Sequence, residues 1–557
     1  MIENSGTSVT NNCPEYNANV PVKLPGTIEK FVDELPIPQV LNPVSQGNDS
    51  AYYEVEMKCG SHKFHRDFNE TIIYGYNGIY PGPTIETMRG QTVNVKWINH
   101  LPLDHFLPVD KTLPGAMNNP EVRTVVHLHG ANVAPDSDGH PEAWFTRNFA
   151  DVGPKYSRQV FEYPNDQQAT TLWYHDHALG VTRLNLYAGL AGFYLIHDEH
   201  ELSLDLPKGK YDIPLMIQDK TFRADGSLFY PANTVPPASV HPSVVRAFIG
   251  NTMVVNGKVW PYLNVEPRKY RFRMLNASNT NGFTFYLLDE NNKRQPFLQI
   301  GTDGGMIRKT KRLIEFPLDP AERLDVIIDF SKFAGQTITL RTEELNLQGF
   351  PETFKEDVME FRVGLEVECE DESKIPIKLR HFEKLKPKKM DPKPKTRRFV
   401  MTEDQDAQSR LMLTINHLMF HDPATETPEI DSVEIWEFAS PIFNPNSPLG
   451  IPPNITHPIH PHLVQFQILE RQDFDINDFN EQEWINNGKG IKLGKKHPPD
   501  PSEIGWKDTV RVEPGKVTRI IVPFKNYTGE YVWHCHILEH EDHDMMRPLI
   551  ITEKNCD

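Results

Sequence analysis

Four copies of one short pattern, a histidine followed two positions later by another histidine, occur in this sequence. They are His127/His129, His175/His177, His460/His462 and His534/His536. In a β-strand, alternate residues project from the same face, so each pair would aim two imidazole rings at one place. The chain has 23 histidines in 557 residues, for which chance gives about one such pair. The four pairs therefore predict metal ligands, and eight imidazoles are enough for several ions.

A cysteine lies inside the last pair, in the segment WHCHILEH. If His534 and His536 point to one face of a strand, Cys535 must point to the other face, and a second metal site must lie there. The candidate ligands of this second site are His457, Cys535, His540 and Met545. Two imidazoles, a thiolate and a weakly bound thioether form the ligand set of blue-copper electron transfer, whereas zinc prefers a closed tetrahedral set without methionine. Chemistry alone leaves Met546 as an alternative axial ligand.

The elements that must position these residues recur along the chain. VHLHG (126–130) precedes WYHDHA (173–178), and HPIHPHL (457–463) precedes VWHCHI (532–537). A strand with alternating large apolar residues also appears in GQTVNVKWINH, in PRKYRFRMLNA and, less clearly, in DSVEIWEF. We expect their inward residues to be Val93, Val95 and Trp97; Tyr270, Phe272 and Met274; and Val433 and Ile435. The sequence thus predicts three related β-sandwich domains, with the metal chemistry in the first and the third.

The composition favours an all-β chain of several domains. A length of 557 residues suggests about three domains, and 47 prolines with 33 glycines interrupt long helices. The 76 acidic side chains outnumber the 58 lysines and arginines, which disfavours nucleic acid and anionic membranes as partners. We identify no membrane-spanning run and no export signal at the start. The five cysteines are scattered and fit synthesis in a reducing cytoplasm.

Breaks in composition suggest the domain boundaries. We predict a flexible extension at 1–28, a first domain at 29–200, a second at 201–365, a linker at 366–398 and a third domain at 399–557. The stretch from Lys384 to Arg398 is rich in lysine and proline, so it has little to bury. An anchoring patch for an acidic partner is the alternative interpretation of this stretch.

The motifs HLHG, WYHDH, HPIHPH and HCHILEHEDHDMM resemble the four copper motifs of the multicopper oxidases. The resemblance extends to DSDGHPEAWF, YNGIYPGPTIE, VNGKVWPYLNVEPRKYRFRMLNASN, PAERLDVIIDF and GWKDT, and covers most of residues 29–555. It is closest to the bacterial spore-coat laccases, which also act as bilirubin oxidases. It implies three cupredoxin-like Greek-key β-sandwich or barrel domains and four coppers per chain.

The resemblance also implies a role for each candidate ligand. The type 1 copper would be held by His457, Cys535, His540 and Met545; the type 2 copper by His127 and His460; and the type 3 pair by His129, His175, His177, His462, His534 and His536. The family has acidic residues near its copper cluster, which match Asp138 and Glu541 here. Because the reduction of dioxygen to water consumes protons, carboxylates that relay them are expected. The alternative is that both are ordinary loop acids.

Two residues depart from the pattern of these relatives. His543 stands where they often have an aromatic residue, and we expect it to face solvent rather than to add a fifth imidazole near the type 1 site. Ile249 stands where they often have a cysteine, which puts a disulfide near the substrate site in doubt and suggests a looser mouth.

The implied activity is that of a laccase. Phenols, aromatic amines or bilirubin-like tetrapyrroles would lose single electrons at the type 1 copper, and dioxygen would be reduced to water at the other three. A Cu(I)-oxidising enzyme, a copper nitrite reductase and a non-enzymatic coat or copper-storage protein are the competing interpretations. The 15 methionines are spread out, which disfavours the first of these. We expect a monomer, deposited in the spore coat with other coat proteins.

Overall fold

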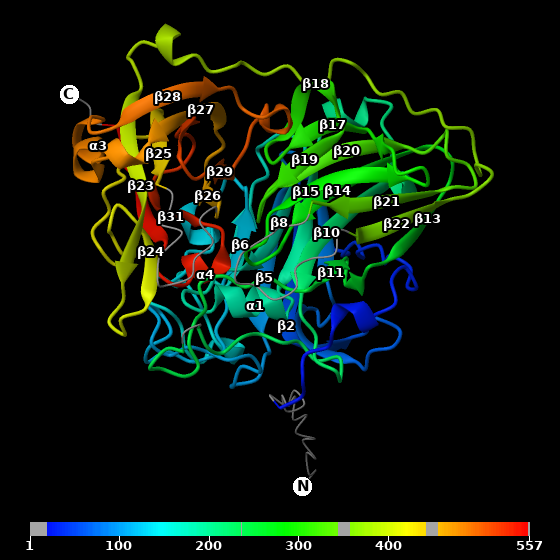
Figure 1. The fold of residues 1–557 in the computed structure, drawn as a ribbon, viewed down its shortest axis with the longest axis horizontal. Helices are drawn as coiled ribbons and strands as arrows, with labels where there is room; N and C mark the ends of the chain where they lie inside the picture. The colour runs from blue at the N-terminus through cyan, green and yellow to red at the C-terminus, as the bar shows by residue number, and fades with distance from the viewer. Residues whose placement is uncertain (1–18, 235–236, 344–356, 442–454, 555–557) are drawn as a thin grey trace.

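The computed structural model describes residues 19–234, 237–343, 357–441 and 455–554. This part of the chain is built almost entirely from β-strands, which confirms the predicted all-β class. Its α-helices are short: α1 (Thr182–Ala188), α2 (Glu199–Leu202), α3 (Glu481–Asn487) and α4 (Leu538–Glu541). The strands form six sheets, which group along the sequence into three pairs. Figure 1 shows the middle pair in green beside the orange and red strands of the last pair.

The first pair of sheets uses strands from the first two hundred residues. A five-stranded sheet has the order β1-β2-β5-β7 with β3 against β2, and a four-stranded sheet has the order β4-β9-β8-β6. The strands are β1 (Ser45–Gln46), β2 (Ser50–His62), β3 (Thr71–Tyr76), β4 (Gly82–Met88), β5 (Thr92–Asn99), β6 (Val126–His129), β7 (Val160–Tyr163), β8 (Thr170–Asp176) and β9 (Ala191–His197). The first two histidine pairs lie on β6 and at the end of β8.

The middle pair of sheets carries none of the histidine pairs. Its sheets have the orders β12-β11-β10-β14-β20-β17-β18 and β13-β22-β21-β15-β16, with β19 against β15. The strands are β10 (Asp212–Lys220), β11 (Thr252–Val255), β12 (Lys258–Val259), β13 (Tyr262–Val265), β14 (Lys269–Asn276), β15 (Phe283–Asp289), β16 (Arg294–Gln295), β17 (Phe297–Thr302), β18 (Gly305–Leu313), β19 (Glu315–Leu318), β20 (Arg323–Asp329), β21 (Thr337–Thr342) and β22 (Asp357–Val363). One apolar core runs through this pair and the first.

The last pair of sheets encloses a second apolar core. Its sheets have the orders β24-β23-β25-β30-β27-β28 and β29-β26-β31-β32. The strands are β23 (Lys395–Gln405), β24 (Leu411–Ile415), β25 (Val433–Ser440), β26 (His457–Pro461), β27 (Gln467–Asp475), β28 (Lys492–His497), β29 (Val510–Val512), β30 (Lys516–Pro523), β31 (Gly529–Cys535) and β32 (Met546–Ile551). The third and fourth histidine pairs lie on β26 and β31 or directly after them.

Two of the three predicted strand faces are correct. The inward residues expected on β5 and β14 are buried. On β25 the predicted phase is wrong, because Val433 and Ile435 are half-buried while Glu434, Trp436 and Phe438 are buried. The two aromatic rings bury more apolar area than the aliphatic side chains do. Glu434 can share their face because it pairs with Arg397 and accepts a hydrogen bond from the Trp436 indole.

The predicted linker ends too late. Strand β23 begins at Lys395, inside the stretch assigned to the linker, and pairs with β25 in parallel. Arg397 and Arg398 stay in this strand because they form ion pairs with Glu434 and Glu437. The predicted extension lies outside the described residues up to 18, and its remaining part packs on the protein, where the Lys23 amide donates to the Phe222 carbonyl.

The cysteines differ in state. Cys59 is disulfide-bonded, whereas Cys369 is free and exposed and Cys535 is free and buried. Among the described residues, no helix combines the length and the apolar character that crossing a lipid bilayer requires.

Candidate metal centres

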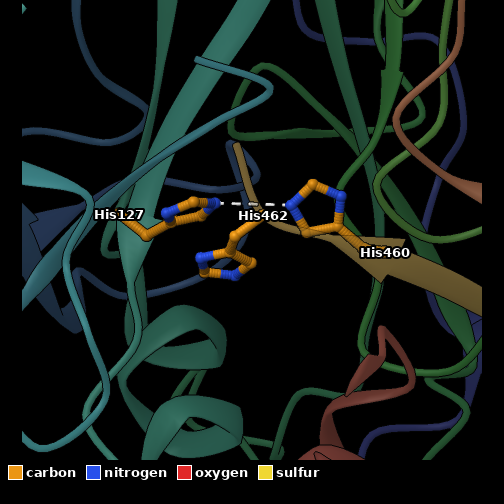
Figure 2. Close-up of side chains that lie close together, drawn as sticks. All are labelled: His127, His460 and His462. Atoms are coloured by element: carbon orange, nitrogen blue, oxygen red, sulfur yellow. Dashed lines mark hydrogen bonds between the residues drawn. The ribbon is translucent and has the colours of Figure 1, made fainter. Parts of the chain in front are cut away.

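Two strand pairs aim the histidines at one another. In β6 and β8, His127 lies opposite His175, and in β26 and β31, His460 lies opposite His534. All eight histidines of the four pairs are at most 1% exposed. Figure 2 shows His127 from β6 facing His460 from β26, with the His462 ring stacked on that of His127. The strands of the first and last sheet pairs therefore enclose one histidine cluster between them.

The cluster divides into groups whose ligand atoms lie within 4.8 Å of one another. The all-histidine groups are His129, His175 and His536; His177, His462 and His534; and His127, His460 and His462, and a further group combines His129 and His460 with Asp508. In the second group, the His534 Nε2 atom is 3.2 Å from the Nε2 atoms of both His177 and His462. Nitrogens bound at about 2.0 to 2.1 Å to one tetrahedral ion lie about 3.3 Å apart. The spacing is that of ligands to a shared metal ion.

The protonation of His127 and His460 excludes a hydrogen bond between their facing Nε2 atoms. His127 Nδ1 donates to the Asp138 carbonyl at 2.6 Å, and His460 Nδ1 donates to the Asp508 carbonyl at 2.8 Å. Burial lowers the pKa of His127 well below its usual value and the pKa of His460 to about 3, so both rings are neutral. Each Nε2 then has a lone pair and no proton, yet the two atoms are 3.4 Å apart. A cation between them resolves this contact, so the donor set fits a metal.

A second centre lies on the opposite face of β31, as the alternation of the strand predicts. The Cys535 sulfur is 3.5 Å from His457 Nδ1 and 3.7 Å from His540 Nδ1, and the three residues form a buried ligand group. Burial raises the pKa of the Cys535 thiol well above its usual value. A bound cation would offset the free-energy cost of ionising the buried thiol, because the thiolate is the form that ligates metals.

The two methionines lie in different surroundings. Met545 belongs to the same apolar cluster as Cys535 and Ile459, whereas Met546 packs with Leu179, Phe420 and Val532. Met546 pairs with His534 in the ladder between β31 and β32. Met545 is therefore the methionine on the side of the cysteine centre.

Comparison with known proteins identifies the family. Two models described as multicopper oxidase match residues 389–555 and residues 58–109 and 115–201. The chain is 47% identical to a laccase of Bacillus subtilis over 95% of this chain and 99% of that protein. It is 38% identical to a laccase of Haloferax volcanii over 98% and 89% of the two chains. The crystal structure of a laccase from Pediococcus acidilactici has a TM-score of 0.72 at 28% identity and covers 94% of this chain and 95% of that one.

The chain belongs to the multicopper oxidase family. Membership makes it a laccase-type, copper-dependent oxidoreductase with cupredoxin-like domains that reduces dioxygen to water. Four coppers per chain are general to the family, and the two buried centres fit them. The family named in the sequence prediction is confirmed.

Both predicted acidic residues contact the histidine cluster of this multicopper oxidase. The Glu541 carboxylate lies 3.1 Å from His534 Nδ1 and 3.6 Å from His177 Nδ1. Asp138 Oδ2 accepts a hydrogen bond from His462 Nδ1 at 2.7 Å. Burial raises the pKa of Glu541 to about 8 and that of Asp138 well above its usual value. Both carboxyl groups are buried, with 1% exposure each.

An acid that the sequence prediction missed also touches the cluster. Asp508 Oδ1 is 3.1 Å from His129 Nε2, and Arg323 on β20 forms a two-pronged ion pair with the Asp508 carboxylate. His129 therefore presents Nδ1 to its group, and this atom has no hydrogen-bond partner among the described residues. The motif GWKDT, which contains Asp508, was the available signal, but sequence alone could not show what it faces.

The structure corrects the expectation for His543. Its side chain is 6% exposed rather than facing solvent, and its Nε2 lies 3.0 Å from Asp406 Oδ2. Asp406 also accepts a hydrogen bond from the Arg410 guanidinium, which pairs in turn with Asp110. Because Asp406 gives the His543 imidazole a hydrogen-bond partner, His543 can be buried without binding a metal.

Ile249 lines a pocket beside the cysteine centre. The pocket has a volume of about 570 Å³ and lies between the middle and last pairs of sheets, with Thr456 next to His457 on its wall. Ile249 is half-buried there.

Proposed function

We propose that this multicopper oxidase oxidises phenols, aromatic amines or bilirubin-like tetrapyrroles. The observation that carries the proposal is the pocket of about 570 Å³, whose wall includes Ile455 and Thr456, directly before the candidate ligand His457. An aromatic molecule in this pocket lies within electron-transfer reach of the cysteine centre without approaching the buried histidine cluster. Substrate and dioxygen then occupy separate sites.

We assign the ligands as the resemblance implies. The type 1 copper would be held by His457, Cys535, His540 and Met545; the type 2 copper by His127 and His460; and the type 3 pair by His129, His175, His177, His462, His534 and His536. The three-nitrogen groups support the two type 3 positions, and the facing Nε2 atoms of His127 and His460 support the type 2 position.

The chain connects the two centres through neighbouring residues. Bound copper would supply one-electron transfer at the cysteine centre and dioxygen reduction at the histidine cluster. Cys535 is bonded through the backbone to His534 on one side and His536 on the other, so an electron arriving at the sulfur has a short covalent path to the cluster. The backbone carbonyl of Cys535 also accepts a hydrogen bond from His534 Nδ1 at 3.1 Å.

Glu541 and Asp138 would supply protons. Each dioxygen molecule needs four protons and four electrons to give two waters, and water access to a buried cluster is restricted. Burial raises the pKa of the Glu541 carboxyl, and its contacts with His534 and His177 place it where it can pass a proton toward the cluster. Asp138 lies against His462 and His127 on another side of the cluster.

Copper analysis and substrate oxidation test the proposal together. The purified protein is loaded with copper, its copper content and blue absorption are measured, and oxygen uptake is followed with 2,6-dimethoxyphenol, an aromatic diamine, bilirubin and Cu(I). We expect about four coppers per chain, a blue colour, and oxygen uptake with the organic reductants. Uptake with Cu(I) alone would overturn the organic substrate class, and a colourless copper-loaded protein would overturn the type 1 assignment.

A monomer, synthesis in the cytoplasm and association with spore-coat proteins stay predictions. Sedimentation of the purified protein tests the first, and fractionation of sporulating source cells tests the other two.

A further inference from the structure

Two stretches that lie far apart in the sequence bring basic side chains together at one rim of the molecule. Residues 376–380 of the connecting segment run beside β18, where Thr310 donates its backbone amide to the Ile377 carbonyl and Leu379 donates its amide to the Arg308 carbonyl. Figure 1 shows this segment as a yellow-green trace that passes β18 on its way from the middle sheets to the last ones. The exposed basic residues of β18 therefore lie next to the lysine-rich stretch that follows.

A pocket with a volume of about 410 Å³ lies between β18 and this stretch. Its cationic lining residues are Arg308, Lys384, Lys386 and Lys389. Glu383 is the one acidic residue among the described residues that line it. No carboxylate in the described part of the chain forms an ion pair with any of the four cations. Exposed lysines elsewhere do have such partners, as Lys155 pairs with Glu530.

Two further lysines face each other beside the pocket. Lys309 on β18 lies opposite Lys378 in an antiparallel bridge, and both side chains are exposed. Like charges that are directly opposite each other destabilise a sheet. The formal net charge of the whole chain is −18, so this local excess of positive charge runs against the composition. A negatively charged partner would relieve the repulsion between the two lysines.

The lysine-rich stretch is held against the protein. Leu379 is buried in an apolar cluster with Ile307. The Gln467 side chain accepts a hydrogen bond from the Leu385 amide at 3.0 Å and donates one to the Glu383 carbonyl at 2.9 Å. A block of like charges with nothing to hold it would be disordered. Because these contacts fix the backbone between the lysines, a partner that binds there has less conformational entropy to remove.

We propose that this basic surface docks an acidic segment of another polypeptide. We define the surface by six cations: Arg308, Lys309, Lys378, Lys384, Lys386 and Lys389. Carboxylates of the segment enter the pocket and neutralise cations that the protein leaves without a counter-charge.

Two features favour a polypeptide over other anions. Ile377, next to Lys378, is 77% exposed, and an apolar side chain of this kind contacts a polypeptide better than a phosphate chain. The negative charge of the rest of the molecule also repels a long nucleic acid. A short acidic segment contacts the basic surface without meeting that field.

Charge reversal at the pocket tests the proposal. One variant combines Lys384→Glu, Lys386→Glu and Lys389→Glu. The matched control combines Lys293→Glu, Lys332→Glu and Lys525→Glu, which changes the net charge equally at three exposed lysines in separate turns. The copper-loaded enzymes are titrated against a short labelled peptide of glutamate with a few leucines, and against an oligothymidylate of equal length, with fluorescence anisotropy as the readout. Sedimentation reports self-association, and copper content, blue colour and oxygen uptake report the metal centres.

We expect the unaltered enzyme to bind the peptide at about 50 mM salt and to release it at about 500 mM, because salt screens exposed charges. The pocket variant should bind the peptide at least about tenfold more weakly, while the control changes its affinity by less than about twofold. Copper content, blue colour and oxygen uptake should stay unchanged in both.

Three results would overturn the proposal. The first is the absence of peptide binding, or an equal loss of binding in the control, which would leave only a net-charge effect. The second is oligothymidylate binding as tight as peptide binding and weakened by the same reversal, which would make the surface a nucleic-acid site. The third is self-association that the pocket variant alone abolishes, which would make the occupant a second copy of this chain.

Discussion

The chemistry of single side chains separates the two centres. At the histidine cluster, each neutral imidazole donates a hydrogen bond from one ring N–H to a carbonyl or carboxylate oxygen and presents its other nitrogen to the cluster. His127 and His460 are the clearest cases. At the other centre, a thiol is buried without charge compensation until a metal binds. The sequence predicts which residues gather at each centre, because strand alternation fixes their faces. It could not predict the tautomers, since these depend on carbonyls from distant loops such as that of Asp508.

Replacing the sulfur tests the cysteine centre. Cys535→Ser should abolish the blue colour completely after copper loading, because the absorption arises from charge transfer between thiolate and copper. Copper analysis should still find metal at the histidine cluster, whose ligands are unchanged. A blue Cys535→Ser protein would rule out the type 1 assignment.

Replacing each methionine in turn tests which of them is the axial ligand of the type 1 copper. Met545→Leu should raise the type 1 potential, because the loss of a weak donor disfavours Cu(II) relative to Cu(I). Met546→Leu is the matched control and should leave the potential unchanged, since that side chain packs with Phe420 and Val532 instead. Redox titration of the blue band decides between them, and a shift in the control alone would reverse the assignment.

Replacing Glu541 distinguishes the supply of protons to the cluster from the entry of electrons at the type 1 copper. Glu541→Gln should keep the blue colour and the rate at which substrate bleaches it without oxygen, while slowing turnover by about a hundredfold. Stopped-flow bleaching and steady-state oxygen uptake measure the two processes. If bleaching slowed as much as turnover, Glu541 would support the type 1 site instead.

At the scale of elements, two strand pairs from opposite ends of the chain form the cluster, and a strand of the middle sheets supports it. Arg323 on β20 is 1% exposed and pairs with Asp508, whose carbonyl and carboxylate contact His460 and His129. Sequence reasoning assigned no chemistry to the middle of the chain, because it contains no histidine pair. An arginine that acts through an aspartate 185 residues away in the sequence leaves no local pattern.

Breaking the ion pair between Arg323 and Asp508 should lower both the stability of the fold and the copper binding of the histidine cluster. Arg323→Met leaves the buried Asp508 charge unpaired and should cost about 3 to 5 kcal/mol in the free energy of unfolding. Copper content should fall at the cluster more than the blue colour does. Denaturant unfolding and copper analysis of Arg323→Met, Asp508→Asn and the double variant form a cycle. Additive losses in unfolding free energy would show that the two residues do not act as a pair.

At the scale of the whole molecule, the all-β class and the placement of ligands in the first and last thirds follow from repeated motifs. The errors arose where one residue decided the outcome. Glu434 is buried because Arg397 neutralises it, so the buried face of β25 differs from the expected one. The same ion pair holds Arg397 in β23, so that strand begins inside the predicted linker. Asp406 similarly turns His543 inward. Long-range ion pairs of this kind cannot be identified from periodicity or composition.

In the proposed reaction, electrons taken singly from substrate at the cysteine centre are used together to reduce dioxygen to water at the histidine cluster. The most direct measurement is the stoichiometry of the copper-loaded enzyme, with oxygen uptake, phenol consumption and hydrogen peroxide recorded in one vessel. We expect about four one-electron oxidations of phenol per dioxygen and no accumulated peroxide. About two oxidations per dioxygen, with peroxide formed in equal amount, would contradict it.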